Sequence, residues 1–385
     1  MPPPNRRRAL ALLAFALLST SPLLAQPIFT WTDLGSLGGD KTYAYAINDS
    51  GQVTGQSVTD GGFAQAFLFS GGSMSNVDSL ARTSAGFGIN NSGTVVGSVV
   101  LNNGATVNAF VRPIAGSLTP LGTLGGNFSE AFGINSDGDI TGYSTVSGDA
   151  FTHVYRYSGT SMTDVGSLAG TVSVGRAIND NGVITGYAYT SGNASVKAFL
   201  TGGTLTDSDI IGTLAGGTNS MGFALSNAGE VAGASTSSVP NVFRAFSRPE
   251  DPGVLVNLGM LPIGSSSVGY GVNSAGDVVG AILDSTNIED AVQLHPSLLA
   301  AFLYTDGQMY NLNELLATPL GFTLTDARGI NASGQIIANG TLGGVDHAFL
   351  LSPTAIPEPA TYALAFGAVA MGIAVFRRTA KRAAC

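Results

Sequence analysis

The sequence predicts an all-β fold, a seven-bladed β-propeller of four-stranded repeats, between two terminal targeting segments. Only 11% of the 385 residues are charged and 53 are glycine, a composition typical of short strands joined by tight turns. Hydrophobic residues make up 44% of the chain, enough for a packed core. A third observation is a strand-like pattern that recurs seven times.

The N-terminal segment is predicted to be a signal peptide over residues 1–25. Arg6, Arg7 and Arg8 precede an apolar run, residues 9–18, and small residues lead to a cleavage site after Ala25. A membrane anchor is the alternative interpretation. The apolar run is too short for it. We therefore expect a signal helix that is removed on export.

The C-terminal segment, residues 354–385, is predicted to be a sorting signal. Pro357, Glu358 and Pro359 precede an apolar run at 360–376, and Arg377 and Arg378 begin a basic tail. At ~1.5 Å per residue the run forms a transmembrane helix of roughly 25 Å. The basic tail is expected in the cytoplasm, which leaves the predicted propeller, residues 27–353, on the outside.

The exported part is acidic and free of cysteine. Residues 27–356 contain nine basic and 24 acidic residues, a formal net charge of −15. This balance argues against nucleic acid as a partner. The one cysteine, Cys385, lies in the predicted cytoplasmic tail, so neither disulfides nor thiolate metal ligands are expected outside.

Each repeat contains a landmark at the end of an alternating segment. The landmark residues are Asn48, Asn90, Asn135, Asn179, Ser226, Asn273 and Asn331, at spacings of 42, 45, 44, 47, 47 and 58 residues. A glycine follows each by three positions: Gly51, Gly93, Gly138, Gly182, Gly229, Gly276 and Gly334. Asn-x-x-Gly predicts a type I turn closed by a G1 bulge. The alternative is a calcium loop at 135–139, but the rest of the ligand set is missing.

The residues before each landmark predict the innermost strand of a blade. Small residues stand two and four positions before it, and large residues stand between them: Tyr45, Phe87, Phe132, Arg176, Phe223, Tyr270 and Arg328. This alternation has the period of a β-strand. Apolar segments such as 66–69 and Leu-Gly-x-Leu-Gly-Gly segments such as 121–126 complete four strands per repeat.

The N-terminus is predicted to close the ring. The last repeat lacks a Leu-Gly-x-Leu-Gly-Gly segment, and a spare copy lies at residues 34–39. Residues 30–39 should therefore pair beside residues 325–351. Such closure leaves no open end in the stack of sheets.

The recurring segments resemble the HAF-type extracellular repeats of bacteria, and the C-terminal segment resembles the PEP-CTERM sorting signal. Among the repeats, His347-Ala348-Phe349 keeps the family's histidine. The resemblance implies a propeller-like fold, an extracellular location and cleavage by an exosortase-type transpeptidase. It also implies a Gram-negative cell that makes exopolysaccharide, with transient residence in the inner membrane.

No catalytic, cofactor-binding or metal-binding residues are predicted. His153, His295 and His347 fall in different repeats, and Asp207 with Asp209 and Glu289 with Asp290 are interpreted as loop charges. Arg156, Arg176 and Arg328 interrupt apolar patterns; they are interpreted as salt-bridging side chains, with a ligand-binding ring face as the alternative.

Two functions follow as expectations. The first is a non-catalytic scaffold of the cell envelope or extracellular matrix, linked to exopolysaccharide, biofilm or other envelope proteins. The alternative is a carbohydrate-active hydrolase or lyase on the same propeller. Two or three carboxylates with Arg or His at one mouth of the ring would favour the enzyme. A mouth lined by Ser, Thr, Asn and backbone would favour the scaffold.

Overall fold

A computed structural model describes residues 26–78, 82–239, 242–250, 253–292, 298–318 and 321–354. The predicted signal peptide lies outside the described residues, as do Pro357, Glu358, Pro359, Arg377 and Arg378 of the sorting signal and the apolar run at 360–376. Within the described residues, no helix combines the length and apolarity needed to cross a membrane.

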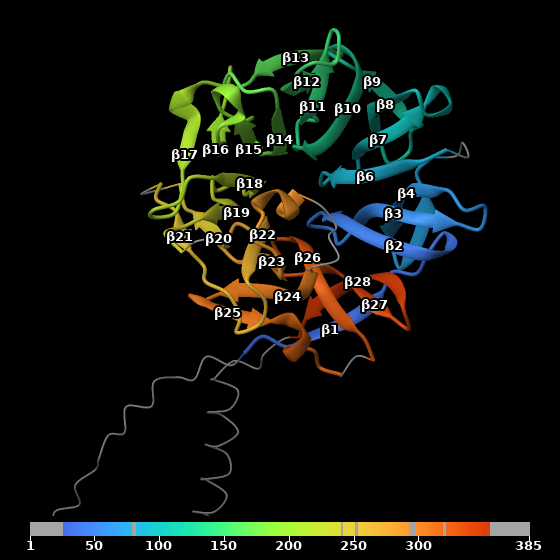
Figure 1. Ribbon diagram of the computed structural model, residues 1–385. Coiled ribbons are helices and arrows are strands. Elements are labelled where there is room, and N and C mark those ends of the chain that lie inside the picture. Colours follow the sequence, from blue (N-terminus) through green and yellow to red (C-terminus); the bar gives the residue numbers. More distant parts are fainter. Residues whose placement is uncertain are drawn as a thin grey trace, which may run out of the picture. The chain divides into compact units, whose positions relative to one another are not determined.

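The described chain is all-β and consists of small antiparallel sheets within one compact unit, residues 28–355. Figure 1 shows the sheets side by side around a common centre. The strands of the first half are β1 (Phe29–Asp33), β2 (Gly38–Ile47), β3 (Val53–Thr59), β4 (Ala64–Ser70), β5 (Ser73–Asn76), β6 (Ser84–Ile89), β7 (Val95–Leu101), β8 (Thr106–Arg112), β9 (Thr119–Gly122), β10 (Gly125–Ile134), β11 (Ile140–Val146), β12 (Thr152–Ser158) and β13 (Ser161–Gly166).

The strands of the second half belong to the remaining four repeats. They are β14 (Ser173–Ile178), β15 (Ile184–Tyr189), β16 (Val196–Thr201), β17 (Ile210–Gly212), β18 (Ser220–Leu225), β19 (Val231–Thr236), β20 (Phe243–Arg248), β21 (Val256–Asn257), β22 (Ser266–Val272), β23 (Val278–Leu283), β24 (Leu298–Thr305), β25 (Gln308–Asn311), β26 (Thr323–Ile330), β27 (Ile336–Leu342) and β28 (Val345–Pro353). Short 3₁₀ turns are η1 (Asn102–Gly104), η2 (Ser191–Asn193), η3 (Asp207–Asp209), η4 (Ile288–Val292) and η5 (Leu312–Glu314).

The third strand of each repeat carries the apolar Ala-Phe pair, or Val154-Tyr155 in β12, and this pair is buried on both faces. β4, for example, pairs with β3 on one side and β5 on the other. An aromatic ring at the matching position of each repeat has no exposed surface: Phe67, Phe110, Tyr155, Phe199, Phe246, Phe302 and Phe349. Full burial of such a ring removes a large apolar area from water, which explains why an aromatic residue occurs at this position in all seven repeats.

The side chains of the first strand of each repeat do not simply alternate between the two faces of the sheet, because the strand contains a β-bulge. In β2, Ala44 pairs with Gly55 and Ala46 with Thr54, so Tyr45 has no partner on β3. The same register shift occurs at the matching position of β6, β10, β14, β18, β22 and β26. A bulge aims its extra residue away from the regular ladder. Here that residue is the large one of the predicted alternation.

The N-terminal strand pairs with the last repeat, as predicted, but its boundary differs. β1 runs antiparallel to β28, from Phe29 opposite Pro353 to Asp33 opposite Phe349. The predicted segment 30–39 is therefore a strand only to residue 33, and Gly38 already belongs to β2, opposite Thr59 of β3. Glycines allow the intervening residues to turn, with Gly35 at φ +75°. In the second, third and fourth repeats the outer strand ends early in the Leu-Gly segment, at Gly122, Gly166 and Gly212, and the remainder leads to the next repeat.

Candidate functional site

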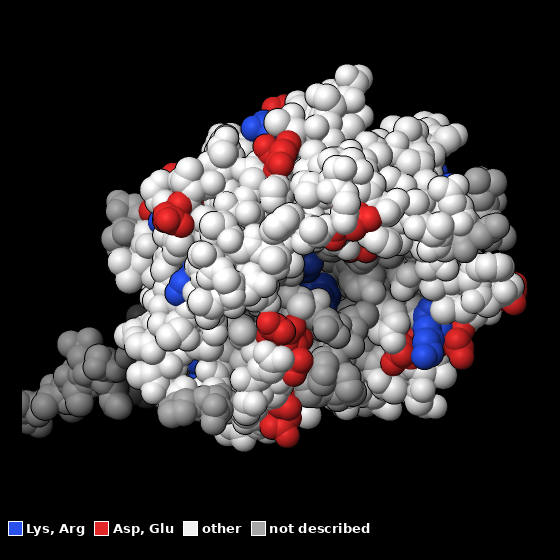
Figure 2. All heavy atoms as spheres, turned by 45° about the horizontal axis from the view of Figure 1, so that its top comes forward, with Lys and Arg blue, Asp and Glu red and all other residues white. Residues whose placement is uncertain are grey.

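The bulged residues of the seven inner strands meet in one central cavity of about 420 Å³. It is lined by Tyr45, Phe87, Glu130, Phe132, Arg176, Phe223, Tyr270, Val292 and Arg328. Each inner strand contributes one large side chain, because each has its bulge at the same position. Figure 2 shows basic side-chain atoms on the floor of a hollow in the middle of one face. A cavity of this volume suits a small molecule.

The lining side chains form a chain of ring and guanidinium contacts around the cavity. The Tyr45 and Phe87 ring centroids are 5.3 Å apart, and those of Phe87 and Phe132 are 5.2 Å apart. The guanidinium of Arg176 lies 4.2 Å from the Phe132 centroid and 5.5 Å from that of Phe223. Aromatic faces attract cations and stack on flat apolar surfaces, so the wall is apolar with two cationic positions.

Arg328 is paired within the wall. Its Nε contacts the carboxylate of Asp326 two residues earlier, with side-chain exposures of 9% and 1%. Its guanidinium also lies 4.0 Å from the Tyr270 ring centroid. Arg328 Nη2 and the Tyr270 hydroxyl are both buried without a well-formed hydrogen bond. The two groups interact with each other electrostatically.

Arg176 has no such partner. Within the described residues, no carboxylate oxygen lies within 4.0 Å of its guanidinium. Glu130, the one carboxylate among the described lining residues, is near enough to interact electrostatically. Burial raises the pKa of the Glu130 carboxyl, and Arg176, Ser98 and Tyr143 oppose that rise. Burial lowers the pKa of Arg176, yet a guanidinium stays protonated in proteins.

The insertion of the sixth repeat reaches this cavity. Val292 of η4 lines it, and Ile288 and Ala291 of the same turn are buried in a cluster with Tyr187 and Tyr189. The Tyr189 hydroxyl donates a 2.6 Å hydrogen bond to Glu289 Oε1. η4 thus connects the sixth repeat to the fourth at the edge of the cavity.

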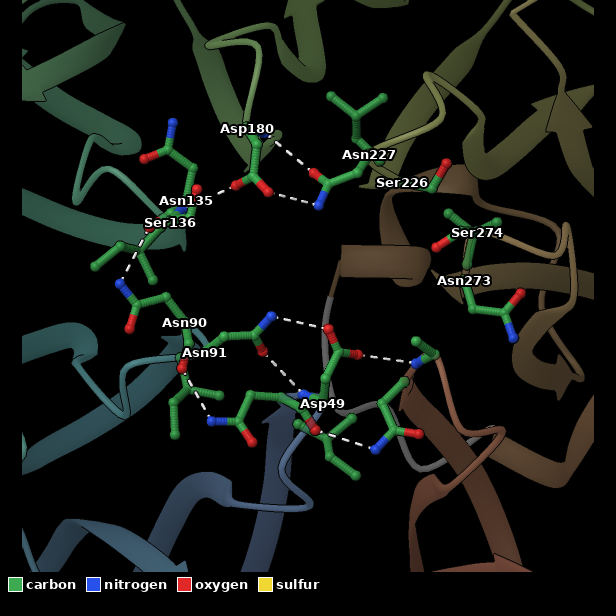
Figure 3. Close-up of a pocket in the computed structure, with 18 of the residues that line it drawn as sticks. Asp49, Asn90, Asn91, Asn135, Ser136, Asp180, Ser226, Asn227, Asn273 and Ser274 are labelled. Atoms are coloured by element: carbon green, nitrogen blue, oxygen red, sulfur yellow. Dashed lines mark hydrogen bonds between the residues drawn. The ribbon is translucent and has the colours of Figure 1, made fainter.

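The opposite ends of the inner strands form a polar pocket of about 220 Å³ (Figure 3). Landmark asparagines bond to the next turn: the side-chain Nδ2 atoms of Asn48, Asn90 and Asn135 donate to the backbone oxygens of Asn90, Asn135 and Asn179 at 2.9, 3.1 and 3.1 Å. Asn331 Nδ2 donates to Asn48 O at 3.1 Å. The first and last repeats are therefore linked by the same contact.

In most turns the residue after the landmark adds a second bond to a neighbouring turn on the surface. Asp49 and Asn91 exchange hydrogen bonds of 3.0 and 2.8 Å, and Asp180 and Asn227 exchange bonds of 3.1 and 2.7 Å. A ring of aliphatic residues separates this polar pocket from the bulged residues: Ile47, Ile89, Ile134, Ile178, Leu225, Val272 and Ile330.

The predicted turn residues all lie in tight turns. The backbone N–H of Gly51 donates to Asn48 O at 3.0 Å, and Gly51 has φ +72°. The matching bond is present in all seven repeats: Gly93 to Asn90, Gly138 to Asn135, Gly182 to Asn179, Gly229 to Ser226, Gly276 to Asn273 and Gly334 to Asn331. The calcium-like loop is part of this pattern, and its Asp139 pairs with Arg156.

The other candidate side chains remain dispersed. His153 contacts Asp164 at 2.9 Å and His347 contacts Asp33 at 2.8 Å, in different repeats. Asp209 accepts a bond from Thr206 N as part of a capping box at η3. Within the described residues, no group of three or more His, Cys, Asp or Glu side chains is arranged to hold a metal ion. Residue 295 lies outside the described residues.

Sequence reasoning missed three features of the site. It identified the large residues before each landmark but not the bulge that turns them toward the centre. It explained the landmark asparagines as turn formers and missed their amide bonds to the neighbouring repeat. Glu130 was missed entirely, although a signal exists: the other inner strands carry Tyr43, Ala85, Val174, Met221, Val268 and Asp326 at its position, so only two of the seven are acidic.

The fold and the site together define a propeller-like all-β protein with a cavity at the centre of its sheets. The chain belongs to the family described as "Protein of unknown function (DUF3466)", which it matches over residues 126–347. No curated protein matches the sequence.

Solved structures resemble the chain at low identity. A structure from a study of two prolyl endopeptidases has a TM-score of 0.53 and 10% identity, covering 86% of this chain and 51% of that one. An oligogalacturonate lyase from Vibrio parahaemolyticus has a TM-score of 0.49 and 10% identity, covering 86% and 92%. A lectin from Aleuria aurantia has a TM-score of 0.37 and 11% identity, covering 84% and 100%. The first of these supports the propeller-like fold alone.

Proposed function

We propose that the chain is an exported, non-catalytic interaction scaffold of the cell envelope or extracellular matrix, linked to exopolysaccharide or to other envelope proteins. The observation that carries this proposal is the central cavity, to which each of the seven inner strands contributes one large side chain. Such a lining suits recognition, because aromatic rings and guanidinium groups provide contact area and orientation for a bound molecule.

The scaffold is a seven-bladed propeller closed by its N-terminal strand. Pairing of β1 with β28 and the bond from Asn331 Nδ2 to Asn48 O support closure. Deletion of residues 27–40 should therefore destabilise the whole domain rather than fray one end. A deletion variant that unfolds at the same urea concentration as the full chain would show that the ring does not depend on this strand.

The alternative function is a carbohydrate-active hydrolase or lyase, and a hydrolase requires carboxylates that converge on a bound sugar. Among the described lining residues the central cavity has one carboxylate, Glu130. The polar pocket at the other end is lined mainly by Asn, Ser and backbone, and its two carboxylates, Asp49 and Asp180, already accept hydrogen bonds from Asn91 and Asn227. Both arrangements favour binding over hydrolysis, which uses two carboxylates at a fixed separation. Release of reducing ends from a purified exopolysaccharide, abolished by Glu130→Gln, would favour the enzyme instead.

The proposal includes export and C-terminal sorting through the HAF-like repeats and the PEP-CTERM-like signal. An exosortase-type transpeptidase should cleave the chain near Pro359 after transient insertion of the 360–376 segment in the inner membrane. Mass spectrometry of the protein recovered from the cell exterior should find no peptide that contains Cys385. Recovery of that peptide outside the cell would refute processing.

Association with the matrix is tested on the processed protein recovered from producing cells. Beads that carry purified exopolysaccharide should retain it, and beads that carry a neutral dextran should not. A protein that elutes from both at the same salt concentration would not be a matrix scaffold.

A further inference from the structure

We propose that the central cavity binds a carboxylate-bearing sugar, a uronate residue, with Arg176 as the ligand of its carboxylate. This inference rests on the scaffold function proposed above and specifies the chemical class that the cavity recognises. Three observations lead to it: the aromatic wall, the guanidinium of Arg176 that has no ion pair among the described residues, and the ion pair that the second arginine, Arg328, already makes with Asp326.

The wall provides faces for a sugar ring. Phe87 and Phe132 lie next to each other in the lining, and Phe223 and Tyr270 follow on the other side of Arg176, with their ring centroids 5.6 Å apart. Pyranose rings expose C–H groups on their faces and hydroxyl groups on their edges. Aromatic rings pack against the former, and the Tyr270 hydroxyl in the wall is a hydrogen-bonding group for the latter.

The two arginines of the wall differ in charge compensation. Arg328 already contacts the carboxylate of Asp326, which is itself held by Asn339 Nδ2 at 3.2 Å. Arg176 stands over Phe132 with no carboxylate oxygen within 4.0 Å among the described residues. A guanidinium binds a carboxylate through two parallel hydrogen bonds, and that geometry is strongest where water is excluded. Arg176 is therefore the position at which an anionic group gains most.

Glu130 argues against a cationic ligand. It is the single carboxylate among the described lining residues, and two guanidinium groups share the cavity with it. Burial raises the pKa of its carboxyl and so disfavours its negative charge. A cationic sugar would be repelled by two guanidinium groups, whereas the carboxylate of a uronate would be attracted by a guanidinium that has no ion pair among the described residues.

The test is isothermal titration calorimetry of the full chain in detergent with D-glucuronate and D-galacturonate. D-glucose, D-galactose and acetate are the comparison ligands. We expect at least one uronate to bind about tenfold or more tightly than its neutral counterpart and than acetate. Equal binding of uronate and neutral sugar, or of uronate and acetate, would overturn the proposal, because either the carboxylate or the sugar ring would then be dispensable.

Variants assign the carboxylate to Arg176. Arg176→Met should weaken uronate binding by about tenfold or more, and Arg176→Lys should retain part of it. Arg156→Met is the matched control: this arginine pairs with Asp139 away from the cavity, and its loss should leave affinity unchanged. Wild-type affinity in folded Arg176→Met would overturn the assignment.

Matrix retention separates this inference from the function on which it rests. If the full chain binds exopolysaccharide beads but no free uronate, the cavity assignment fails and the scaffold function stands. If it binds uronate and no matrix, the scaffold function fails and the site stands.

Discussion

The two ends of the inner strands differ in how their polar groups are satisfied. At the turn end, Asn48, Asn90, Asn135 and Asn331 use their amides to bond to a neighbouring turn, and the residue hardly varies among repeats. At the bulge end, one residue per strand varies from phenylalanine to arginine, and buried donors such as Arg328 Nη2 lack partners. At the turn end, contacts between repeats determine which residue is present. At the bulge end, the residue can instead be determined by the ligand that the cavity binds.

The largest effect is expected from breaking the ion pair between Arg328 and Asp326 at the variable end. Arg328→Met leaves Asp326, which is 1% exposed, without its counter-charge. We expect a loss of about 3–5 kcal/mol in the free energy of unfolding, measured by urea denaturation. The double variant Arg328→Met/Asp326→Leu should recover most of it. A single variant as stable as the wild type would mean that water already solvates Asp326.

The turn end should respond to loss of a landmark amide. Asn48 donates to Asn90 O and Gln52 Oε1 and accepts from two backbone N–H groups, so Asn48→Ala should cost about 2–3 kcal/mol. Asn48→Ser should cost about half, because the fifth repeat has Ser226, whose hydroxyl accepts from Glu230 N at 3.1 Å.

Ser274→Ala, in the same polar pocket, is the control and should change stability by less than about 0.5 kcal/mol. Equal losses for Asn48→Ala and Ser274→Ala would show that the amide bonds between turns contribute nothing.

A smaller effect concerns the pH dependence of the cavity. Burial raises the pKa of Glu130 above its ordinary 4.5 in the folded state. The stability that protonated Glu130 provides is therefore complete below about pH 4.5 and is lost as pH rises through the folded-state pKa. The Glu130→Gln variant should gain stability relative to the wild type between pH 4.5 and pH 7. Parallel stability curves across that range would contradict the raised pKa.

Arg176→Met should have little effect on stability, within about 1 kcal/mol of the wild type. Its guanidinium has no ion pair to lose among the described residues, and an apolar side chain fits between Phe132 and Phe223. Thermal unfolding without ligand is the measurement. A loss as large as that expected for Arg328→Met would mean that Arg176 is a structural residue, and the contrast between the two arginines would disappear.

No effect is expected from metal removal. The polar groups of the turn end bond to one another, as Asp49 does to Asn91 and to Ala332 N. The melting temperature should therefore be the same with and without EDTA. A drop of several degrees that calcium reverses would show that the aspartates of this end hold an ion.

The repeat and the pairing of the N-terminal strand could be predicted from the sequence, because turn glycines and buried aromatic residues recur at fixed spacing. The cavity could not. Phe87 and Arg176 occupy equivalent positions in the pattern, and nothing in their own repeats indicates that β-bulges bring them to one centre. The amide bonds between turns were missed for a related reason: Asn48 and Asn90 are 42 residues apart, and the turn alone already explains both.

The bulges also bear on how such a chain can change over generations. A residue that is skipped by the hydrogen-bonded ladder, as Tyr45 is between Ala44 and Ala46, makes no cross-strand pair that its replacement would spoil. Seven such positions face a shared space while the turns and buried rings beside them stay fixed. Exchanging a single side chain at one of these positions therefore alters the chemistry of the central cavity while the sheets and turns keep their structure. New binding specificities become accessible through point substitutions alone.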